Sequence, residues 1–241
     1  MSLEVTRDGF LGGRLSIAQP RRGFRAGHDT VLLAASVPAT AGSRVLELGS
    51  GAGVASLCLA SRVPGVQITG IEIDPELVAL AGGNAERNAM TERVRFECGD
   101  AASFGAEAAF DHVFFNPPFH PADGEESPSA GRDLAMRDAS NALADWTRNA
   151  LHLTRADGTV TAILRADRAD ELLAAGQTTG AVLFPLFPRA GETPKRAIVQ
   201  FHKGSPAPML LAAGLILHQQ DGRNTQAAEA VLRHGAALRL V

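Results

Sequence analysis

Residues 45–53 read VLELGSGAG, an apolar run that ends in the three glycines Gly49, Gly51 and Gly53. The apolar run predicts a buried strand, and the glycines predict a tight turn that leads into a helix. Glycines at this spacing let the backbone pass closely beneath a ligand that a Cβ atom would obstruct, although a tight connection would also use them. The stretch therefore predicts the strand, turn and helix that open a doubly wound α/β domain.

Beyond this turn, short β-rich runs alternate with helical patterns, as in parallel strands joined by right-handed crossovers. Strands are predicted over 44–48, 67–73, 94–98, 112–116 and 158–164. Helices are predicted over 54–62, 75–88, 139–153, 167–175 and 225–233. Asp74 directly precedes Pro75, a pair typical of a capped first helical turn.

The rhythm changes after residue 180, where VLFPLFPR and RAIVQFHKG are separated by AGETPK and predict an antiparallel hairpin at the sheet edge. The expected fold class is α/β, with a doubly wound, mostly parallel seven-stranded sheet that ends in this hairpin. One domain is expected over 1–241, with an N-terminal extension over 1–43, a core over 44–204, and a C-terminal strand and helix over 205–241.

The composition fits a single soluble domain, because 45% of the 241 residues are apolar. The first twenty residues lack the pattern of a signal peptide, and no run approaches the roughly 18 apolar residues that cross a bilayer. Cys58 and Cys98 lie on separate segments and are predicted to be reduced, buried thiols. A cytoplasmic location is the expectation.

The net charge of -3 conceals a division along the chain. Residues 1–44 carry 6 basic and 3 acidic side chains, residues 45–130 carry 4 and 13, and residues 131–241 carry 13 and 10. Basic flanks can meet phosphate while an acidic centre suits a cationic or hydroxyl-rich ligand, although ordinary surface charge would give the same pattern.

Acidic residues follow the glycine-rich strand and the next two strands. Glu47, two residues before Gly49, would meet a phosphate badly and favours a positively charged ligand such as S-adenosylmethionine. Glu72 ends the second strand at the distance where doubly wound folds present a carboxylate to ribose hydroxyls; Asp74 competes, but it has the capping role. Asp100, with Ala101 after it, ends the third strand, where the carboxylate would accept from an adenine amine or shape a loop.

The fourth strand ends in Asn116-Pro117-Pro118-Phe119. The Asn116 side-chain oxygen and the Pro117 carbonyl are acceptors that together would hold an NH₂ group, and Phe119 offers a face for a stacked base. Proline after a strand is also a simple terminator. The segment 120–133 that follows is rich in Pro, Gly, Ser and acid, so a mobile loop is predicted beside the site.

These motifs, ELGSGAG, GIEIDP, CGD and NPPF, resemble in order and spacing the class I methyltransferases with the small methyltransferase domain, over roughly residues 25–204. The resemblance implies a Rossmann-like methyltransferase fold and S-adenosylmethionine as cofactor. It implies that the cofactor is bound by Glu47, Gly49, Gly51, Gly53, Glu72, Asp100, Ala101 and Asn116. It further implies that the target group is held by the catalytic residues Asn116, Pro117, Pro118 and Phe119.

Within that class the chain is most similar to the tRNA adenine-N6 methyltransferases that act on valine tRNA. GFRAGHDTVLLAASV, RDLAMRDASNALADW and PKRAIVQFHKG carry this likeness. It implies that His28, Asp29 and Thr30 lie over the cofactor, with Asp29 or Thr30 near its methionine end, although capping of a helix is an equal alternative for these two. The partner it implies is RNA, namely tRNA.

Other targets stay open, because Phe119-His120 stands where that subfamily more often has tyrosine and NPPFH is common among guanine-N2 methyltransferases of ribosomal RNA. A glutamine-N5 methyltransferase of proteins would use the same motif. A nicotinamide-dependent oxidoreductase is disfavoured by the glycine spacing and by NPPF.

Substrate contacts are expected around the hairpin connection. Arg189, Lys195 and Arg196 lie there and would contact RNA phosphates, or else form ordinary solvated charge. The histidines lack metal-ligand spacing, so no metal is expected, and the pattern indicates no membrane partner. The oligomeric state is not encoded in these motifs.

Overall fold

The computed structural model describes residues 3–105, 109–117, 139–176 and 180–241. The loop predicted over 120–133 lies outside these residues. The chain opens with an antiparallel hairpin of β1 (Val5–Phe10) and β2 (Leu15–Pro20), joined by the 3-10 turn η1 (Leu11–Gly13). Sequence reasoning assigned no element to this hairpin, because its alternation is interrupted by Arg7, Asp8 and three glycines.

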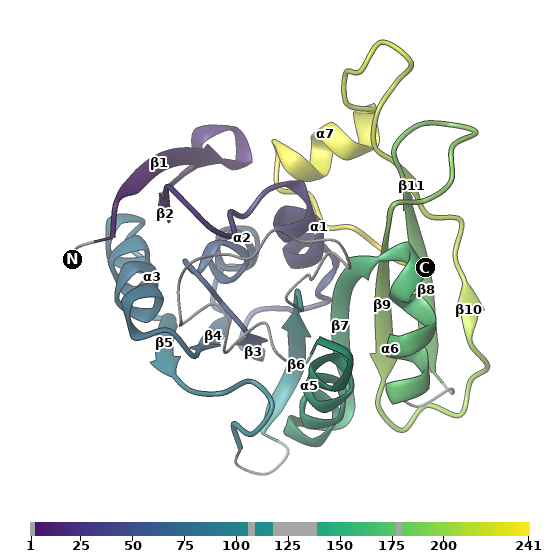
Figure 1. Ribbon diagram of the computed structural model, residues 1–241, viewed down its shortest axis with the longest axis horizontal. Coiled ribbons are helices and arrows are strands. Elements are labelled where there is room, and N and C mark those ends of the chain that lie inside the picture. The colour runs from purple at the N-terminus through teal and green to yellow at the C-terminus, as the bar shows by residue number, and fades with distance from the viewer. Residues whose placement is uncertain (1–2, 106–108, 118–138, 177–179) are drawn as a thin grey trace.

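A central sheet forms the core of the described chain (Figure 1). Its strands are β3 (Arg44–Leu48), β4 (Gln67–Glu72), β5 (Val94–Cys98), β6 (Phe110–Phe115), β7 (Thr154–Arg165), β8 (Ala181–Phe187), β9 (Arg196–His202), β10 (Leu210–Leu211) and β11 (Leu215–Ile216). The order is β10-β8-β9-β7-β6-β3-β4-β5, and β11 also pairs with β8. Neighbouring strands from β5 to β7 are parallel, and β9 runs antiparallel to β7 and β8. The predicted fold class is confirmed, with two short strands added at the edge.

Most of the predicted helices form with boundaries within one residue of expectation. The helices are α1 (His28–Ser36), α2 (Val54–Arg62), α3 (Pro75–Arg87), α5 (Ala139–Leu153), α6 (Ala169–Ala175) and α7 (Gln226–Leu232). The prediction over 167–175 divides, because a 3-10 turn, η2 (Ala166–Arg168), precedes α6. Asp74 caps α3 as expected, since its side chain accepts a hydrogen bond from the Glu76 amide at 2.8 Å.

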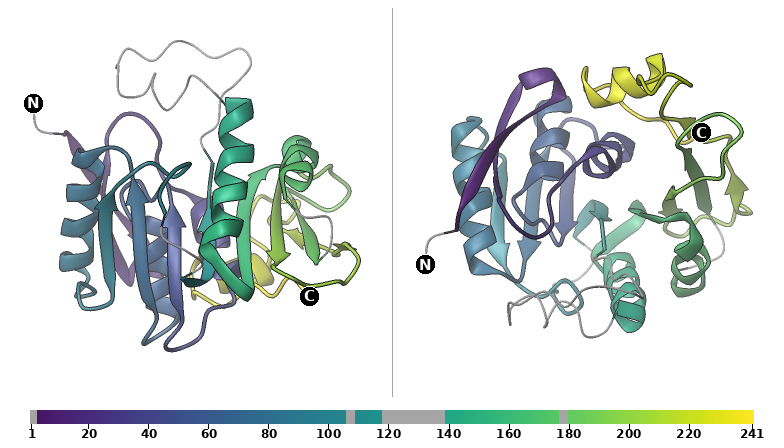
Figure 2. Two further views of the ribbon diagram at one scale, coloured as in Figure 1. Left: turned by 90° about the horizontal axis from the view of Figure 1, so that it is seen from below. Right: turned by 45° about the horizontal axis from the view of Figure 1, so that its top comes forward.

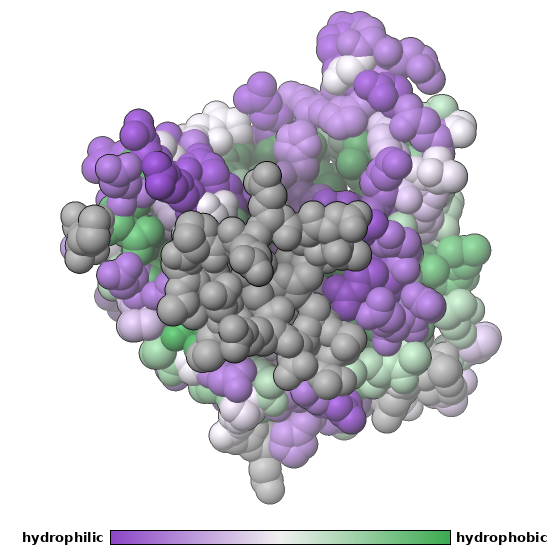
Figure 3. All heavy atoms as spheres, in the orientation of Figure 1, coloured by the Kyte–Doolittle hydropathy of each residue, from purple (hydrophilic) through white to green (hydrophobic). Residues whose placement is uncertain are grey.

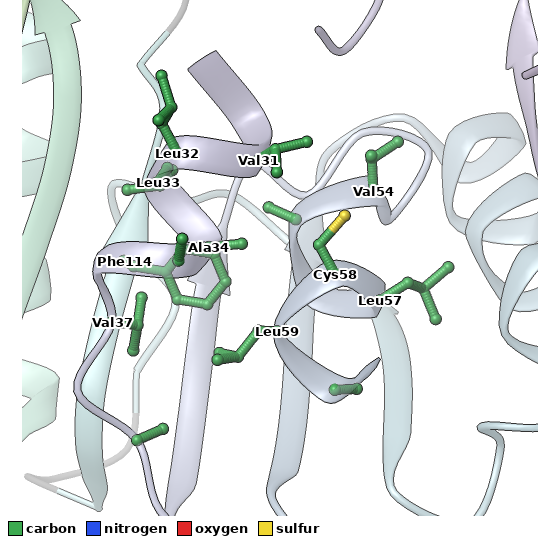
Figure 4. Close-up of a cluster of buried hydrophobic side chains, with 14 of the residues drawn as sticks. Val31, Leu32, Leu33, Ala34, Val37, Val54, Leu57, Cys58, Leu59 and Phe114 are labelled. Atoms are coloured by element: carbon green, nitrogen blue, oxygen red, sulfur yellow. The ribbon is translucent and has the colours of Figure 1, made fainter. Parts of the chain in front are cut away.

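Two apolar layers sandwich the sheet, because successive strand residues point to opposite faces. In β3, Val45 joins the cluster beneath α1, α2, α3, α7 and the hairpin, whereas Leu46 and Leu48 join the cluster beneath α5 and α6. The two helical layers are visible on either side of the sheet in Figure 2. Figure 4 shows apolar side chains of α1 and α2 side by side in the first cluster, which also includes Phe114 of β6.

The cysteines are both free thiols, as predicted, but only Cys58 is buried, and burial raises its pKa to about 12. Cys98 is exposed, which corrects the expectation for it, because it closes β5 at an open edge of the sheet. Within the described ranges, no helix has the length and apolarity needed to cross a membrane.

The strands β3, β4, β5 and β6 end together at Leu48, Glu72, Cys98 and Phe115, and we call this side of the sheet the carboxyl edge. The beginning of α1 lies here too, since Asp29 pairs with Arg196, which is opposite Arg165 at the end of β7. The left view of Figure 2 shows these strands from the side. Loops at this edge of a doubly wound sheet are where ligands bind.

Candidate functional site

The glycine-rich turn after β3 has all three of its glycines at positive φ: 69° at Gly49, 53° at Gly51 and 78° at Gly53. A Cβ atom on Gly49 would lie 2.6 Å from Cη2 of Trp146, and one on Gly53 would lie 2.5 Å from Cζ of Phe96. A Cβ atom on Gly51 would meet nothing within 4 Å. Protein packing therefore requires two of the glycines, and the third faces open space where a ligand has room.

Glu72 links this turn to the end of β4. Its Oε2 accepts from the Gly51 amide at 2.8 Å, and its Oε1 accepts from the amides of Ile73 and Asp74 at 2.9 and 3.1 Å. The carboxylate is thus held in place by three backbone donors. Asp74 is engaged in capping α3, and the choice of Glu72 as the acid that binds a ligand stays a prediction.

The end of β5 supplies a second acid at the same edge. Asp100 is exposed, and its carboxylate accepts from the Ala102 amide at 2.9 Å and from the Ser103 hydroxyl at 3.2 Å. Ala101 beside it is buried. Asp100 therefore has the loop-shaping role that the sequence analysis gave as an alternative to ligand binding. Its side chain is also accessible to a ligand.

Glu47 lies beneath the glycine turn, 5% exposed. Its Oε2 accepts from the amide of Ser56 at 3.0 Å and from the Ser56 hydroxyl, both in the first turns of α2. Burial raises the pKa of Glu47 to about 8, against the opposing effect of these hydrogen bonds. A positive charge bound nearby would lower this pKa and favour the ionised carboxylate.

Three buried polar side-chain atoms at the carboxyl edge have no hydrogen-bond partner among the described residues: Oγ1 of Thr30, Oγ of Ser50 and Oδ1 of Asn116. They belong to α1, to the glycine turn and to the end of β6. Two other such atoms, on Arg62 and His218, lie at the end of α2 and after β11. A buried polar atom without a partner costs roughly 1–3 kcal/mol, so three at one edge indicate a place that a polar ligand completes.

Asn116 follows β6 directly, where Phe115 pairs with Leu48 just before the glycine turn. The asparagine is half-buried and Pro117 is buried. The other two predicted catalytic residues, Pro118 and Phe119, lie outside the described residues. The first half of the motif thus adjoins the glycine turn, as the order of the strands requires.

Asp29 and the basic residues of the β8–β9 connection also lie at this edge. Oδ2 of Asp29 accepts from Nε of Arg196 at 2.7 Å, and neither Asp29 nor Thr30 caps α1, whose cap is Gly27 without a side-chain bond. Arg189 pairs with Glu192 at 3.2 Å, and Lys195 is exposed. The capping alternative is therefore wrong, and Arg196 is engaged within the protein.

No group of three or more His, Cys, Asp or Glu residues that could hold a metal ion occurs in the described part of the chain. His112 is a partly buried histidine with a protein partner: its Nδ1 lies 2.8 Å from Oγ1 of Thr159, and burial lowers its pKa to about 4.

The sequence model of the methyltransferase small domain matches residues 25–148, from the segment before α1 into α5. The chain belongs to the methyltransferase small domain family. It is accordingly a methyltransferase, and the matched segment contains the glycine turn, the strand-end acids and Asn116 together.

Curated relatives of this small-domain methyltransferase extend over nearly the whole chain. The tRNA1(Val) (adenine(37)-N6)-methyltransferase of Pasteurella multocida is 27% identical over 92% of this chain and 93% of its own. The enzyme of the same name from Phocaeicola vulgatus is 27% identical over 78% and 81%.

Solved structures support the fold. The predicted O-methyltransferase Atu636 from Agrobacterium tumefaciens matches with a TM-score of 0.74 and 24% identity, over 88% of this chain and 98% of that one. TrmN from Thermus thermophilus matches with a TM-score of 0.50 and 23% identity, over 73% and 48%. The Rossmann-like methyltransferase fold is confirmed.

Sequence reasoning missed three residues of the site. Ser50 lies between two of the glycines, Ile73 is 46% exposed between two acids, and Trp146 packs against Gly49 from α5. Ser50 and Ile73 are adjacent to predicted ligands and could have been suspected. Trp146 could not, because it is 97 positions from its neighbour and only the packing of α5 on the sheet brings them together.

Proposed function

We propose that this small-domain methyltransferase transfers the methyl group of S-adenosylmethionine to the exocyclic amine of a base in RNA, namely N6 of adenine in tRNA. The observation that carries the proposal is Oδ1 of Asn116, a buried acceptor at the end of β6 that has no partner among the described residues. An NH₂ group is a donor that such an acceptor can hold. The relatives named as tRNA1(Val) (adenine(37)-N6)-methyltransferases support the choice of base and RNA.

The cofactor fits the arrangement of β3, β4 and β5. Glu72 would accept from the ribose hydroxyls and Asp100 from the adenine amine, with Ile73 beside them as an apolar surface. Gly51 faces open space, so the methionine part has room to pass over the turn. Glu47, Asp29 and Thr30 stay proposed contacts at that end. When bound, S-adenosylmethionine supplies a methyl group on a sulfonium, which is an electrophile.

The chemistry at the target nitrogen needs acceptors and no strong base. The side-chain oxygen of Asn116 and the carbonyl of Pro117 would each accept one hydrogen of the NH₂ group. This holds the amine and draws its lone pair out of conjugation, toward the methyl group. The nitrogen–carbon bond forms as the sulfur–carbon bond breaks, and the proton, acidic once the nitrogen is alkylated, passes to water. Phe119 would stack on the base.

We further propose that the described chain works as one domain with an RNA partner. One buried cluster includes Leu11 of η1, Val231 of α7 and Leu240 near the C-terminus, which favours a single domain over separate parts. The RNA would contact the β8–β9 connection, where Lys195 and Arg189 are accessible. These features are compatible with a role in the cytoplasm, where tRNA is modified.

The test is a set of parallel incubations of the purified protein with labelled S-adenosylmethionine and unmodified tRNA, ribosomal RNA or release factor. We expect N6-methyladenosine in tRNA, identified by mass spectrometry. Label in N2-methylguanosine of ribosomal RNA, or in glutamine, would replace the proposed substrate while keeping the site. Absence of methyl transfer to every substrate, from protein shown to bind the cofactor, would contradict the proposal as a whole.

A further inference from the structure

The segment Arg21–Arg22–Gly23–Phe24–Arg25, which we call the basic strap, joins β2 to α1 at the carboxyl edge. Phe24 is 66% exposed. Arg22 is exposed, and the guanidinium of Arg21 lies 3.8 Å from the carboxylate of Glu4, with both side chains well exposed. An aromatic ring thus projects into solvent beside arginines, and Figure 3 shows hydrophilic side chains gathered over β1 and β2.

Hydrogen bonds to β1 and β2 hold the strap in shape. The guanidinium of Arg25 donates to Oγ1 of Thr6 at 2.7 Å, to the Pro20 carbonyl at 3.0 Å and to Oδ2 of Asp8 at 2.7 Å. Gln19 adds a bond to the Ala26 amide at 2.8 Å. Because these bonds fix the backbone on both sides of Phe24, exposure of the ring is a property of the framework.

We infer that the basic strap binds an unpaired nucleotide of the RNA substrate beside the target base. Base stacking on an exposed aromatic ring, combined with arginines for the phosphates, is how proteins bind single-stranded nucleic acid. The strap ends at Arg25, shortly before the N-cap of α1 at Gly27, and Thr30 in the first turn of α1 carries a buried hydroxyl without a hydrogen-bond partner among the described residues. This inference rests on the proposed function, since it assumes an RNA substrate.

The experiment compares Phe24→Ala and the double variant Arg21→Ala/Arg22→Ala with Leu211→Ala. Leu211 is a matched control, because it is also 66% exposed but lies on β10, beside the beginning of β8 and away from the carboxyl edge. KM for tRNA, kcat and cofactor affinity are measured. Cofactor affinity is read from Trp146, the single tryptophan of a chain without tyrosine, which packs on the glycine turn.

Phe24→Ala is expected to raise KM for tRNA about tenfold, with kcat at saturating tRNA and cofactor affinity unchanged. The arginine variant should also weaken the dependence of KM on salt. Leu211→Ala should behave as the wild type. If the wild type methylates tRNA and the strap variants keep its KM, the strap inference is overturned alone. If the wild type methylates no RNA, the proposed function is overturned with it.

An independent observation concerns two asparagines four positions apart, Asn84 in the last turn of α3 and Asn88 at the C-cap of that helix. Asn84 exchanges two hydrogen bonds with the backbone of Ala18 in β2, at 2.8 and 2.9 Å. Asn88 does the same with Ser16, at 3.0 Å for both bonds. Each side-chain amide therefore accepts from and donates to the backbone of β2, as the backbone of a neighbouring strand would.

Asn84 also contacts the glycine turn, which Asn88 does not. Its Nδ2 also donates to the carbonyl of Ala52 at 2.9 Å, between Gly51 and Gly53 in the glycine turn. Asn84 is fully buried, so water cannot replace this bond. We propose that Asn84 is a positioning residue, which holds the glycine turn in its cofactor-binding shape and connects that shape to the N-terminal hairpin.

Asn84→Ala and Asn88→Ala form a matched pair. Both variants lose two hydrogen bonds to the backbone of β2, and only Asn84→Ala also loses the bond to the Ala52 carbonyl in the glycine turn. Both should lower the melting temperature, but only Asn84→Ala should weaken cofactor binding, by about five- to tenfold. The pair Asn84→Asp and Asn88→Asp, which keeps the acceptor oxygens, repeats the test if the alanine variants fold poorly. Equal cofactor affinity in the two members of a folded pair would overturn the positioning role.

Discussion

The two halves of the carboxyl edge differ in how their polar groups are satisfied. On the side of β4 and β5, Glu72 and Asp100 already accept hydrogen bonds from neighbouring backbone amides. On the side of α1 and β6, Thr30 and Asn116 each keep a buried oxygen without a partner among the described residues. The first half is organised before a ligand arrives, and the second half is completed by one. Catalysis gains from the second condition, because unmet acceptors act on the group that reacts.

The largest effect is expected where the acceptor is unmet. Asn116→Ala should lower kcat about 10²- to 10³-fold, since loss of one positioned hydrogen-bonding group at a reacting centre has effects of that order. Cofactor affinity, read from Trp146 fluorescence, should stay near that of the wild type. Asn116→Asp, which retains acceptor oxygens, should keep more activity than the alanine variant. Normal methylation by Asn116→Ala would refute the proposed mechanism.

The organised half should respond in binding and not in the chemical step. Glu72→Ala removes three bonds to backbone amides and the proposed contact with the ribose, so cofactor affinity should fall about 10- to 100-fold. At saturating cofactor, kcat should recover most of its value. If Glu72→Ala lowered kcat as much as Asn116→Ala does and left cofactor affinity unchanged, the proposed difference between the two halves of the edge would be wrong.

Substitutions at Gly49 and Gly51 should distinguish the glycine that packing requires from the glycine that faces the ligand. Gly49→Ala would place a methyl group against Trp146 at positive φ and should reduce the free energy of unfolding by roughly 2–3 kcal/mol, measured by denaturant titration. Gly51→Ala meets open space and should cost about 1 kcal/mol, mainly for its positive φ, while it weakens cofactor binding more than Gly49→Ala. Equal stability losses would contradict the assignment of Gly51 to the ligand side.

The buried carboxyl beneath the turn should make stability depend on pH. The pKa of Glu47 in the folded state, about 8, lies above its ordinary value of 4.5, so the folded chain keeps a proton that the unfolded chain loses between these values. Stability contributed by this group therefore falls as pH rises from about 5 to 8. Melting temperatures of Glu47→Gln and the wild type should diverge in favour of the variant across that window. Parallel curves would show that Glu47 is already ionised.

The smallest effect is expected for the ion pair between Asp29 and Arg196, whose side chains are 30% and 34% exposed. Asp29→Asn should change the free energy of unfolding by less than about 1 kcal/mol, and less in high salt. A large loss of cofactor affinity with little loss of stability would support the proposed contact of Asp29 with the methionine end.

Local sequence patterns were sufficient for most of the fold. The apolar run before Gly49, the Asp74-Pro75 cap and the two β-rich runs after residue 180 each report backbone preferences within a few residues, and the structure contains the corresponding elements. The parallel order then follows from the alternation of strands and helices. Placement of Glu72, Asp100 and Asn116 at one edge follows as well, since parallel strands end on the same side.

Contacts between distant segments were decided only by the tertiary structure. The bond from Asn84 to Ala52, the packing of Trp146 on Gly49 and the unmet oxygen of Asn116 have no local signature, because each depends on how helices pack on the sheet. Even Glu47, singled out from its spacing, acquired its raised pKa from burial beside Ser56. The sequence by itself determined which elements form and which edge bears the site. Packing decided which side chains are satisfied there and which await a ligand, because satisfaction depends on partners brought together from across the chain.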